Sequence, residues 1–248
     1  MRIQQQPAYI IHHTDYSESS LLLEILTRDH GRVGIIAKGA RRPRSGKRAL
    51  LNPFSPLLVS WSGRGELGVL TDLEANGLPL ALTGDLLYCG FYVNELMLRL
   101  LHRNDVHVAL FDGYQQCLQA LQFKQGSDAA LRLFEALVLQ EIGYGIVLDH
   151  DTRNSAPIQA EVAYEYVADS GPRRLNAGES VRQGIEIRGA SLLALAAGDV
   201  SDLKILKDLK LLMRFLLKHH LGDRPLNSRK LMQSIKNRTR TASGELQN

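Results

Sequence analysis

The sequence has little cysteine, few aromatic residues and no long hydrophobic run. Its 248 residues include only two cysteines, Cys89 and Cys117. Two cysteines build neither a disulfide scaffold nor a four-cysteine zinc site, and they fit a protein of the reducing cytoplasm. The apolar runs are far shorter than a membrane span, and no apolar signal segment stands at the N-terminus. We therefore expect a cytoplasmic protein with no membrane contact.

The net charge is also small, but the charged residues are unevenly distributed. The net charge is +4, composed of +3 over residues 1–80, −6 over 81–200, +8 over 201–240 and −1 from Glu245. Two basic regions thus flank an acidic middle. Such asymmetry indicates a polyanionic partner better than the total charge does.

Short aliphatic runs separated by turn residues predict five strands in the first 80 residues. The runs cover 8–14, 19–27, 33–37, 56–61 and 66–73. Five short strands suit a small closed barrel, and the five-stranded OB-fold is the first candidate. An SH3-like barrel fits the same pattern nearly as well.

From Thr83 onward, apolar residues recur at steps of three and four, which indicates helices. We expect helices over 83–101, 106–123, 127–142, 190–197, 201–219 and 227–235, with Ser127 as the N-cap of the third. Residues 146–190 predict a small irregular or hairpin insertion, with a strand over 162–167. The predicted fold class is α+β: an OB-fold barrel over 1–80, a mostly α-helical domain over 81–240 and a frayed tail over 241–248.

Basic residues are concentrated between the third and fourth predicted strands. Six of the eleven residues from Lys38 to Arg48 are basic and none is acidic. A cationic loop at a barrel edge neutralises phosphates and releases their counterions, and OB-folds bind single strands beside such loops. A merely solvated loop is the alternative. We predict nucleic-acid contacts from Lys38, Arg41, Arg42, Arg44, Lys47 and Arg48.

A second cationic surface is predicted on the helix over 201–219. Lys207, Lys210, Arg214 and Lys218 are spaced by three and four residues, so they share one helical face. The solvated face of an amphipathic helix explains this spacing equally well. Because 201–240 holds eleven basic residues against three acidic ones, we favour a second nucleic-acid surface that includes Lys207, Lys210 and Arg214.

Aromatic side chains, which stack on unpaired bases, make up only 6% of the sequence. The first 80 residues offer Tyr9, Tyr16, Phe54 and Trp61. Phe54 and Trp61 are better explained as core residues. This scarcity favours binding through the nucleic-acid backbone, tolerant of sequence, over readout of bases.

No complete catalytic constellation is present. Asp149, His150 and Asp151 could bind a divalent ion, but they follow a helix end broken by glycines and are typical of a polar loop. The sequence has no phosphate-cradling loop and no nucleophile beside a base. We predict a protein that is not an enzyme and has no cofactor and no metal. A metal-dependent nucleic-acid enzyme and an RNA-binding OB-fold protein are the alternatives.

Arg132 lies in the otherwise apolar first turn of the predicted helix over 127–142. An arginine beside apolar ridges can receive a partner's carboxylate while its stem packs on leucines. An ion pair within the helix, with Asp128 or Glu135, accounts for it equally well from spacing.

Several segments together resemble the RecO family of bacterial recombination mediators. The similarity runs from about residue 8 to about residue 235, and Ala37–Arg41 is its most specific part. The other matching segments are Tyr16–Glu24, Gly31–Arg41, Pro53–Leu58, Tyr92–Met97, Phe134–Glu135 and Gly143–Gly145.

The resemblance implies an N-terminal OB-fold, a helical C-terminal domain and a role in DNA repair. It implies binding of single- and double-stranded DNA, annealing of complementary strands and, with RecR, help in loading RecA. It also implies docking of the acidic C-terminal tail of the single-stranded-DNA-binding protein, for which Arg132 matches an implicated arginine. Many family members carry a four-cysteine zinc site, which this chain lacks because no cysteine follows Cys117.

Overall fold

The chain folds into two compact units. The computed structural model describes residues 2–42, 50–63, 65–124, 126–222, 224–228 and 231. The barrel unit comprises Met1–Gln122 together with Pro225–Asn248, and the helical unit comprises Phe123–Arg224. The chain therefore leaves the barrel unit once and returns to it.

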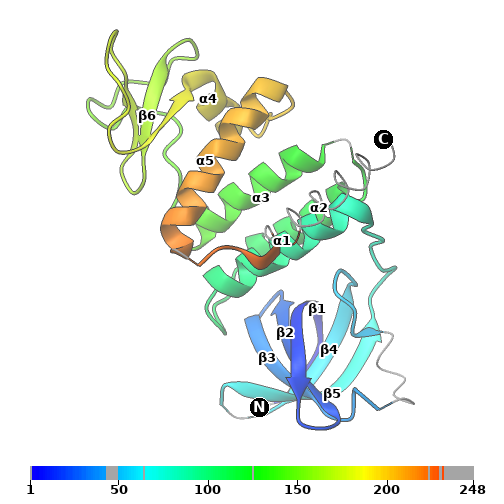
Figure 1. The fold of residues 1–248 in the computed structure, drawn as a ribbon. Coiled ribbons are helices and arrows are strands. Elements are labelled where there is room, and N and C mark those ends of the chain that lie inside the picture. Colours follow the sequence, from blue (N-terminus) through cyan, green and yellow to red (C-terminus); the bar gives the residue numbers. More distant parts are fainter. Residues whose placement is uncertain are drawn as a thin grey trace, which may run out of the picture. The chain divides into compact units, whose positions relative to one another are not determined.

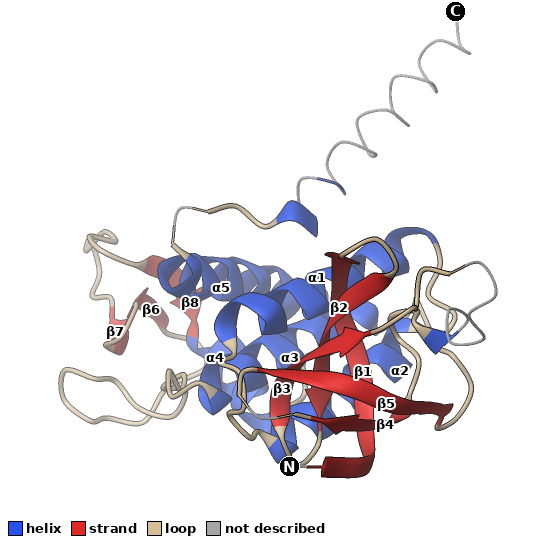
Figure 2. Cartoon of the chain, turned by 90° about the horizontal axis from the view of Figure 1, so that it is seen from below, coloured by secondary structure: helices blue, strands red, loops and turns tan. Residues whose placement is uncertain are grey.

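Five strands form a closed barrel in the first unit (Figures 1 and 2). They pair in the order β1-β2-β3-β5-β4, and β4 closes the barrel on β1. The β3–β5 pair is parallel and the other pairs are antiparallel. This order confirms the OB-fold prediction over the SH3-like alternative. The strands are β1 (Arg2–Tyr16), β2 (Ser20–Thr27), β3 (Gly31–Ala37), β4 (Leu57–Ser62) and β5 (Leu67–Ala75).

Alternating residues of these strands fill the barrel. Side chains two residues apart on a strand point to the same face, so Leu21, Leu23 and Ile25 of β2 all enter the core. Val33 and Ile35 of β3 meet them there. The residues between them face away from the core and form the outer face of the barrel.

Two helices of the barrel unit pack against the barrel, α1 (Gly84–Leu100) and α2 (Val108–Leu121). The ring of Tyr9 lies 5.7 Å from that of Phe111 and 5.1 Å from that of Tyr114. The loop between the helices approaches β3 so closely that a Cβ at Gly31 would lie 1.8 Å from the Asp105 carbonyl oxygen. Gly31 also has φ +64°, so this turn requires glycine.

The returning segment is attached to α1 through one carboxylate. Glu95 accepts hydrogen bonds from the backbone N–H groups of Asn227 and Ser228, both at 2.8 Å, and from the Ser228 hydroxyl at 2.6 Å. Leu226 is buried just before them. These contacts make the segment an integral part of the barrel unit.

The helical unit contains three helices and a small antiparallel sheet in the order β7-β6-β8. Helices α3 and α5 pack on each other, and α4 and β8 pack on α5. The elements are α3 (Ser127–Glu141), β6 (Ala163–Val167), β7 (Gly171–Arg174), β8 (Ile185–Arg188), α4 (Gly189–Ala197) and α5 (Leu203–Leu221). Within the described residues, no helix is both long and apolar enough to cross a membrane.

Most predicted elements are confirmed, with local corrections. The N-cap of α3 is Gly126, not Ser127, whose hydroxyl instead donates to the Lys124 carbonyl at 3.0 Å. The insertion holds the predicted hairpin, β6 with β7, and additionally β8. The predicted boundary after residue 80 falls between β5 and α1, inside the barrel unit, and as a division into domains it stays a prediction. The predicted tail over 241–248 lies outside the described residues.

Candidate nucleic-acid interface

The predicted cationic loop begins where β3 ends. Lys38, Arg41 and Arg42 are all exposed there, on the surface of the barrel unit. The backbone N–H of Arg42 donates to the Gly39 carbonyl at 3.1 Å, which closes a turn over residues 39–42. Arg44, Lys47 and Arg48 lie outside the described residues.

Arg41 is held against the hairpin between β1 and β2. Its backbone N–H donates to the Ser19 carbonyl at 3.0 Å, and its Nη1 donates to the Ser17 carbonyl at 3.1 Å. Its Nη2 lies 3.0 Å from Oδ2 of Asp15 in an exposed ion pair. The hairpin thus orients the guanidinium, and the Asp15 carboxylate offsets part of its charge.

A polar pocket of about 450 Å³ opens beside this ion pair. Its lining combines apolar side chains of the barrel core with polar side chains of β1, the cationic loop and the segment after that loop. The lining residues are His13, Asp15, Leu21, Ala40, Arg41, Leu51 and Asn52. Of the described cations of this loop, Arg41 lines the pocket, and Lys38 and Arg42 are exposed next to it in the sequence.

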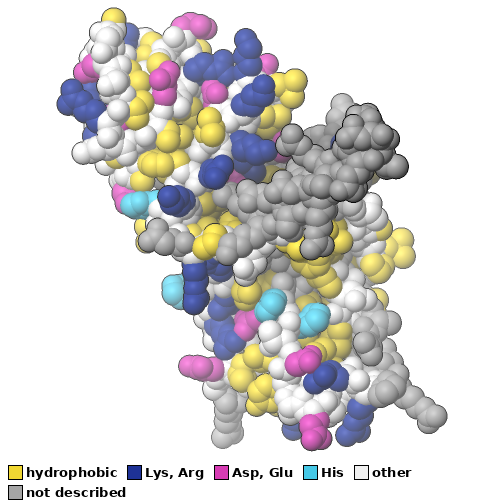
Figure 3. Space-filling model, in the orientation of Figure 1, with side chains coloured by type: hydrophobic (Ala, Val, Ile, Leu, Met, Phe, Trp, Pro, Cys, Tyr) yellow, Lys and Arg dark blue, Asp and Glu magenta, His cyan; other side chains and the backbone are white. Residues whose placement is uncertain are grey.

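The second predicted surface also exists, on α5 in the helical unit. Lys207, Lys210 and Arg214 are exposed, and Figure 3 shows Lys and Arg side chains gathered over this helix. The nearby Asp208 is turned away from them, since its Oδ2 accepts from Arg188 at 2.8 Å and from the Ser191 hydroxyl at 2.7 Å. Within the described residues, the Asp208 carboxylate is thus engaged with β8 and α4 rather than with these cations.

Arg132 is buried rather than open on the surface. It is 5% exposed, and its Nη2 donates to Oε1 of Glu135 at 2.9 Å, while Glu135 is fully buried. The structure thus contains one of the two ion pairs expected from spacing, the one with Glu135. Within the described residues, Nε of Arg132 has no hydrogen-bond partner. Docking of an acidic tail at Arg132 stays a prediction.

Comparison with known proteins divides the chain near residue 80, between β5 and α1. The family model described as "Recombination protein O N terminal" matches residues 1–77, and the one described as "Recombination protein O C terminal" matches residues 82–230. The chain belongs to the RecO family. RecO proteins act in DNA repair and recombination, and the resemblance inferred from the sequence is confirmed.

Curated RecO relatives match nearly the whole chain. The DNA repair protein RecO of Nitrosococcus oceani is 45% identical over 236 residues, which cover 95% of each chain. That of Azoarcus sp. strain BH72 is 41% identical over 94% of this chain and 97% of its own. That of Coxiella burnetii strain RSA 331 is 43% identical over 93% of this chain and 98% of its own.

The three residues considered for a metal in this RecO chain do not converge. His150 Nδ1 lies 2.7 Å from Oδ1 of Asp149, and this hydrogen bond lowers the pKa of the Asp149 carboxyl. Asp151 is buried, and its carboxylate accepts from the backbone N–H groups of Arg153 at 2.8 Å and Arg174 at 3.1 Å. Among the described residues, no group of three or more His, Cys, Asp or Glu side chains is placed to hold a metal ion.

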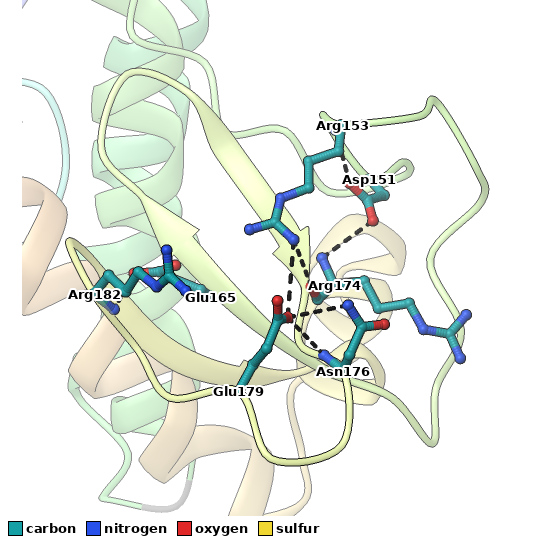
Figure 4. A network of polar contacts seen from close by, with 7 residues as sticks. All are labelled: Asp151, Arg153, Glu165, Arg174, Asn176, Glu179 and Arg182. Carbon is teal, nitrogen blue, oxygen red and sulfur yellow. Dashed lines mark hydrogen bonds and ion pairs between the residues drawn. The ribbon is translucent and has the colours of Figure 1, made fainter.

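Asp151 belongs instead to a polar network around the small sheet of this RecO chain (Figure 4). Oε1 of the buried Glu165 accepts three backbone N–H groups, from Arg182 at 2.7 Å, Gln183 at 2.6 Å and Gly184 at 2.9 Å. Oε2 of Glu179 accepts the backbone N–H of Asn176 at 2.9 Å. Carboxylates thus hold the loops of a segment that contains no cysteine. No sequence pattern predicts this network, because most of its donors are backbone N–H groups.

We expect Glu165→Gln to destabilise the helical unit in a pH-dependent way. Hydrogen bonds from Gln183, Arg182 and Gly184 lower the pKa of the Glu165 carboxyl. Its stabilising contribution is therefore complete above the unfolded-state pKa, about 4.3, and is lost as pH falls through the folded-state pKa. The thermal midpoint of the variant should fall below that of the wild type at pH 7, and the difference should shrink in acid.

Circular dichroism melts between pH 7 and pH 3 test this expectation. Glu161→Gln, which removes an exposed carboxylate close by in the sequence, is the matched control and should melt like the wild type. A Glu165→Gln deficit that is equal at every pH would show that the carboxylate charge is not what stabilises the loop.

Proposed function

We propose that this RecO protein binds single- and double-stranded DNA and anneals complementary strands. The observation that carries the proposal is the exposed group of Lys38, Arg41 and Arg42 at the mouth of an OB-fold barrel. Such cations neutralise phosphates and release counterions, which supplies affinity without sequence preference. The basic face of α5, with Lys207, Lys210 and Arg214, gives the same chemistry on the helical unit.

Annealing in this proposal requires no chemical step. Cations on two surfaces hold two phosphate backbones near each other and reduce their mutual repulsion, while base pairing supplies the specificity. The protein then acts as a mediator and not as an enzyme. Membership of the RecO family supports this assignment.

We also propose that the protein acts together with the single-stranded-DNA-binding protein and RecR to help load RecA. The acidic C-terminal tail of the former would dock on the helical unit at Arg132. The support is the position of Arg132 in α3, where it is 5% exposed and its Nε has no hydrogen-bond partner within the described residues. A tail carboxylate would have to compete with Glu135 for the guanidinium, because that pair is already formed at 2.9 Å.

Annealing of DNA coated with the cognate single-strand binder tests the proposal as a whole. We expect the protein to accelerate annealing of coated strands, and to lose most of this acceleration when the binder lacks its acidic tail. Naked strands, which carry no single-strand binder, are the control. The protein should accelerate their annealing without any need for the acidic tail. Annealing that is unaffected by the protein would refute the proposal, and preference for RNA over DNA of equal length would reassign the ligand.

A further inference from the structure

Base stacking requires an exposed aromatic ring, and the fold leaves one of the barrel's four aromatic residues available. Tyr9, Phe54 and Trp61 are 3%, 3% and 8% exposed, so the core and the packed helices cover their rings. Tyr16, at the end of β1, is 43% exposed. Of these four aromatic side chains, Tyr16 is therefore the one whose ring an unpaired base could reach.

Tyr16 lies on the outer face of the barrel. In the β1–β2 register it stands opposite Ser20, and Thr14 stands opposite Leu22. Leu21 and Leu23 enter the core, so alternation places Ser20 and Leu22, with their partners Tyr16 and Thr14, on the outside. An aromatic ring and a row of strand residues thus share one surface.

This row continues across the sheet as a half-buried aliphatic strip. Leu22 pairs with Ile36 of β3, and Ile36 pairs with Val69 of β5. All three side chains are partly exposed. Thr14, Leu22, Ile36 and Val69 therefore lie side by side next to Tyr16, on a face that could support apolar base surfaces.

The strip has a defined edge on one side. In the next row along the strands, Glu24 is only 7% exposed, because Arg103 and Arg32 form ion pairs with it. Those arginines belong to the contact between the barrel and the segment after α1. On β2 and β3 the open part of the outer face therefore begins at Leu22 and Ile36, whereas on β1 His12, opposite Glu24, is exposed as well.

Cations border the strip on its other side. Ala37 pairs with Leu21, so Lys38 directly follows the last paired residue of β3, and its side chain is exposed. Arg41 is attached to the hairpin by its bonds to Ser17 and Ser19. The charge complementarity of this border identifies the occupant as a polyanion, and the exposed ring selects a polyanion with unpaired bases.

We propose that the outer face of β1–β3 is a single-strand platform, on which Tyr16 stacks against one base while Lys38 and Arg41 contact the flanking phosphates. The proposal rests on the DNA binding proposed above and adds its selectivity. Bases within a duplex are already stacked and paired, so they offer no face to Tyr16. The ring therefore favours single strands, whereas the cations bind both forms.

The test compares Tyr16→Leu with the wild type on oligothymidylate and on a duplex hairpin of equal length. We expect about a 10-fold loss of single-strand affinity, since stacking on an aromatic ring is what leucine lacks. Duplex affinity should stay within about 2-fold, and the salt dependence should not change, because no phosphate contact is removed. Tyr16→Phe keeps the ring and should bind like the wild type.

Two further measurements make the result specific to this face. Tyr144→Leu changes another exposed tyrosine, in the helical unit, and should bind single strands like the wild type. Photo-cross-linking with a 5-iodouracil oligonucleotide should modify the peptide that contains Tyr16. Equal losses of single-strand and duplex affinity in Tyr16→Leu, or an equal loss in Tyr144→Leu, would overturn the platform.

The outcomes also separate this inference from DNA binding by the barrel. If Tyr16→Leu binds single strands normally while a Lys38/Arg41/Arg42→Ala variant binds them weakly, the stacking role is wrong and DNA binding stands. If both variants bind normally, the barrel face binds no DNA and both proposals fail for this unit.

Discussion

Replacing Lys38, Arg41 and Arg42 together with alanine is expected to lower the affinity for DNA by about 10- to 100-fold near 150 mM salt. All three side chains are exposed at the end of β3, so their removal leaves no buried charge and should leave the barrel folded. Because each phosphate contact releases counterions when DNA binds, a variant with fewer contacts releases fewer of them. The slope of log affinity against log salt should therefore become shallower by about 2 to 3 for duplex DNA.

The ion pair of Arg41 with Asp15 modifies this expectation in a testable way. Asp15 lies 3.0 Å from the guanidinium and offsets its charge. Asp15→Asn should consequently raise DNA affinity, in the opposite direction to the alanine variant. The two variants should shift the affinity in opposite directions, and a charge-matched variant away from the barrel separates a specific cationic contact from a general effect of net charge.

Matched variants complete this experiment. Arg173/Arg174/Arg182→Ala removes the same charge from the small sheet, which the proposed interface does not use, and should bind DNA nearly as the wild type does. Lys207/Lys210/Arg214→Ala asks whether α5 contributes its own phosphate contacts. An unchanged affinity and salt slope in the Lys38/Arg41/Arg42 variant would remove this loop from the interface.

The largest expected loss of stability follows from Arg132→Ala, about 3–5 kcal/mol in the free energy of unfolding. Arg132 is 5% exposed and Glu135 is fully buried, so the substitution leaves a carboxylate in the interior without its arginine. The cost comes from the buried carboxylate's loss of its arginine rather than from the net strength of the pair. Chemical denaturation of both proteins measures it.

Removing both charges at once separates the structural role of Arg132 from tail docking. Arg132→Met with Glu135→Leu replaces the buried pair by apolar side chains of similar size, and such replacements are often neutral or stabilising. This double variant should be folded, should bind DNA normally and should fail to bind an acidic tail peptide. Normal peptide binding by the folded double variant would refute docking at Arg132.

The elements of the fold were largely predictable because each depends on local periodicity. Alternation at period two marks β2 and β3, and steps of three and four mark α1 and α5. The strand β8 was not predicted because it has only four residues, Ile185–Arg188, too few to show a period. The N-cap of α3 was misplaced by one residue because Gly126, with φ +88°, takes that position.

The exposed cations of the candidate site were predictable from charge alone, whereas the partners of its buried charged residues were not. The spacing of Arg132 allowed a partner's carboxylate or an ion pair within the helix, and only the packing of α3 shows Glu135 buried beside it. Glu165 receives its hydrogen bonds from residues 17 to 19 positions away. No local pattern encodes such a distance, since it arises when β6 pairs with β8.

The return of the chain to the barrel unit affects how the protein is made on the ribosome. Synthesis delivers the barrel and α1 first, then the whole of Phe123–Arg224, and only afterwards the residues that Glu95 binds, Asn227 and Ser228. The nascent barrel unit therefore has to wait, with the buried site of Leu226 still unfilled, while more than a hundred further residues are added. A premature stop codon just before Pro225 would consequently leave the defect in the barrel unit, most of which is synthesised before the helical unit.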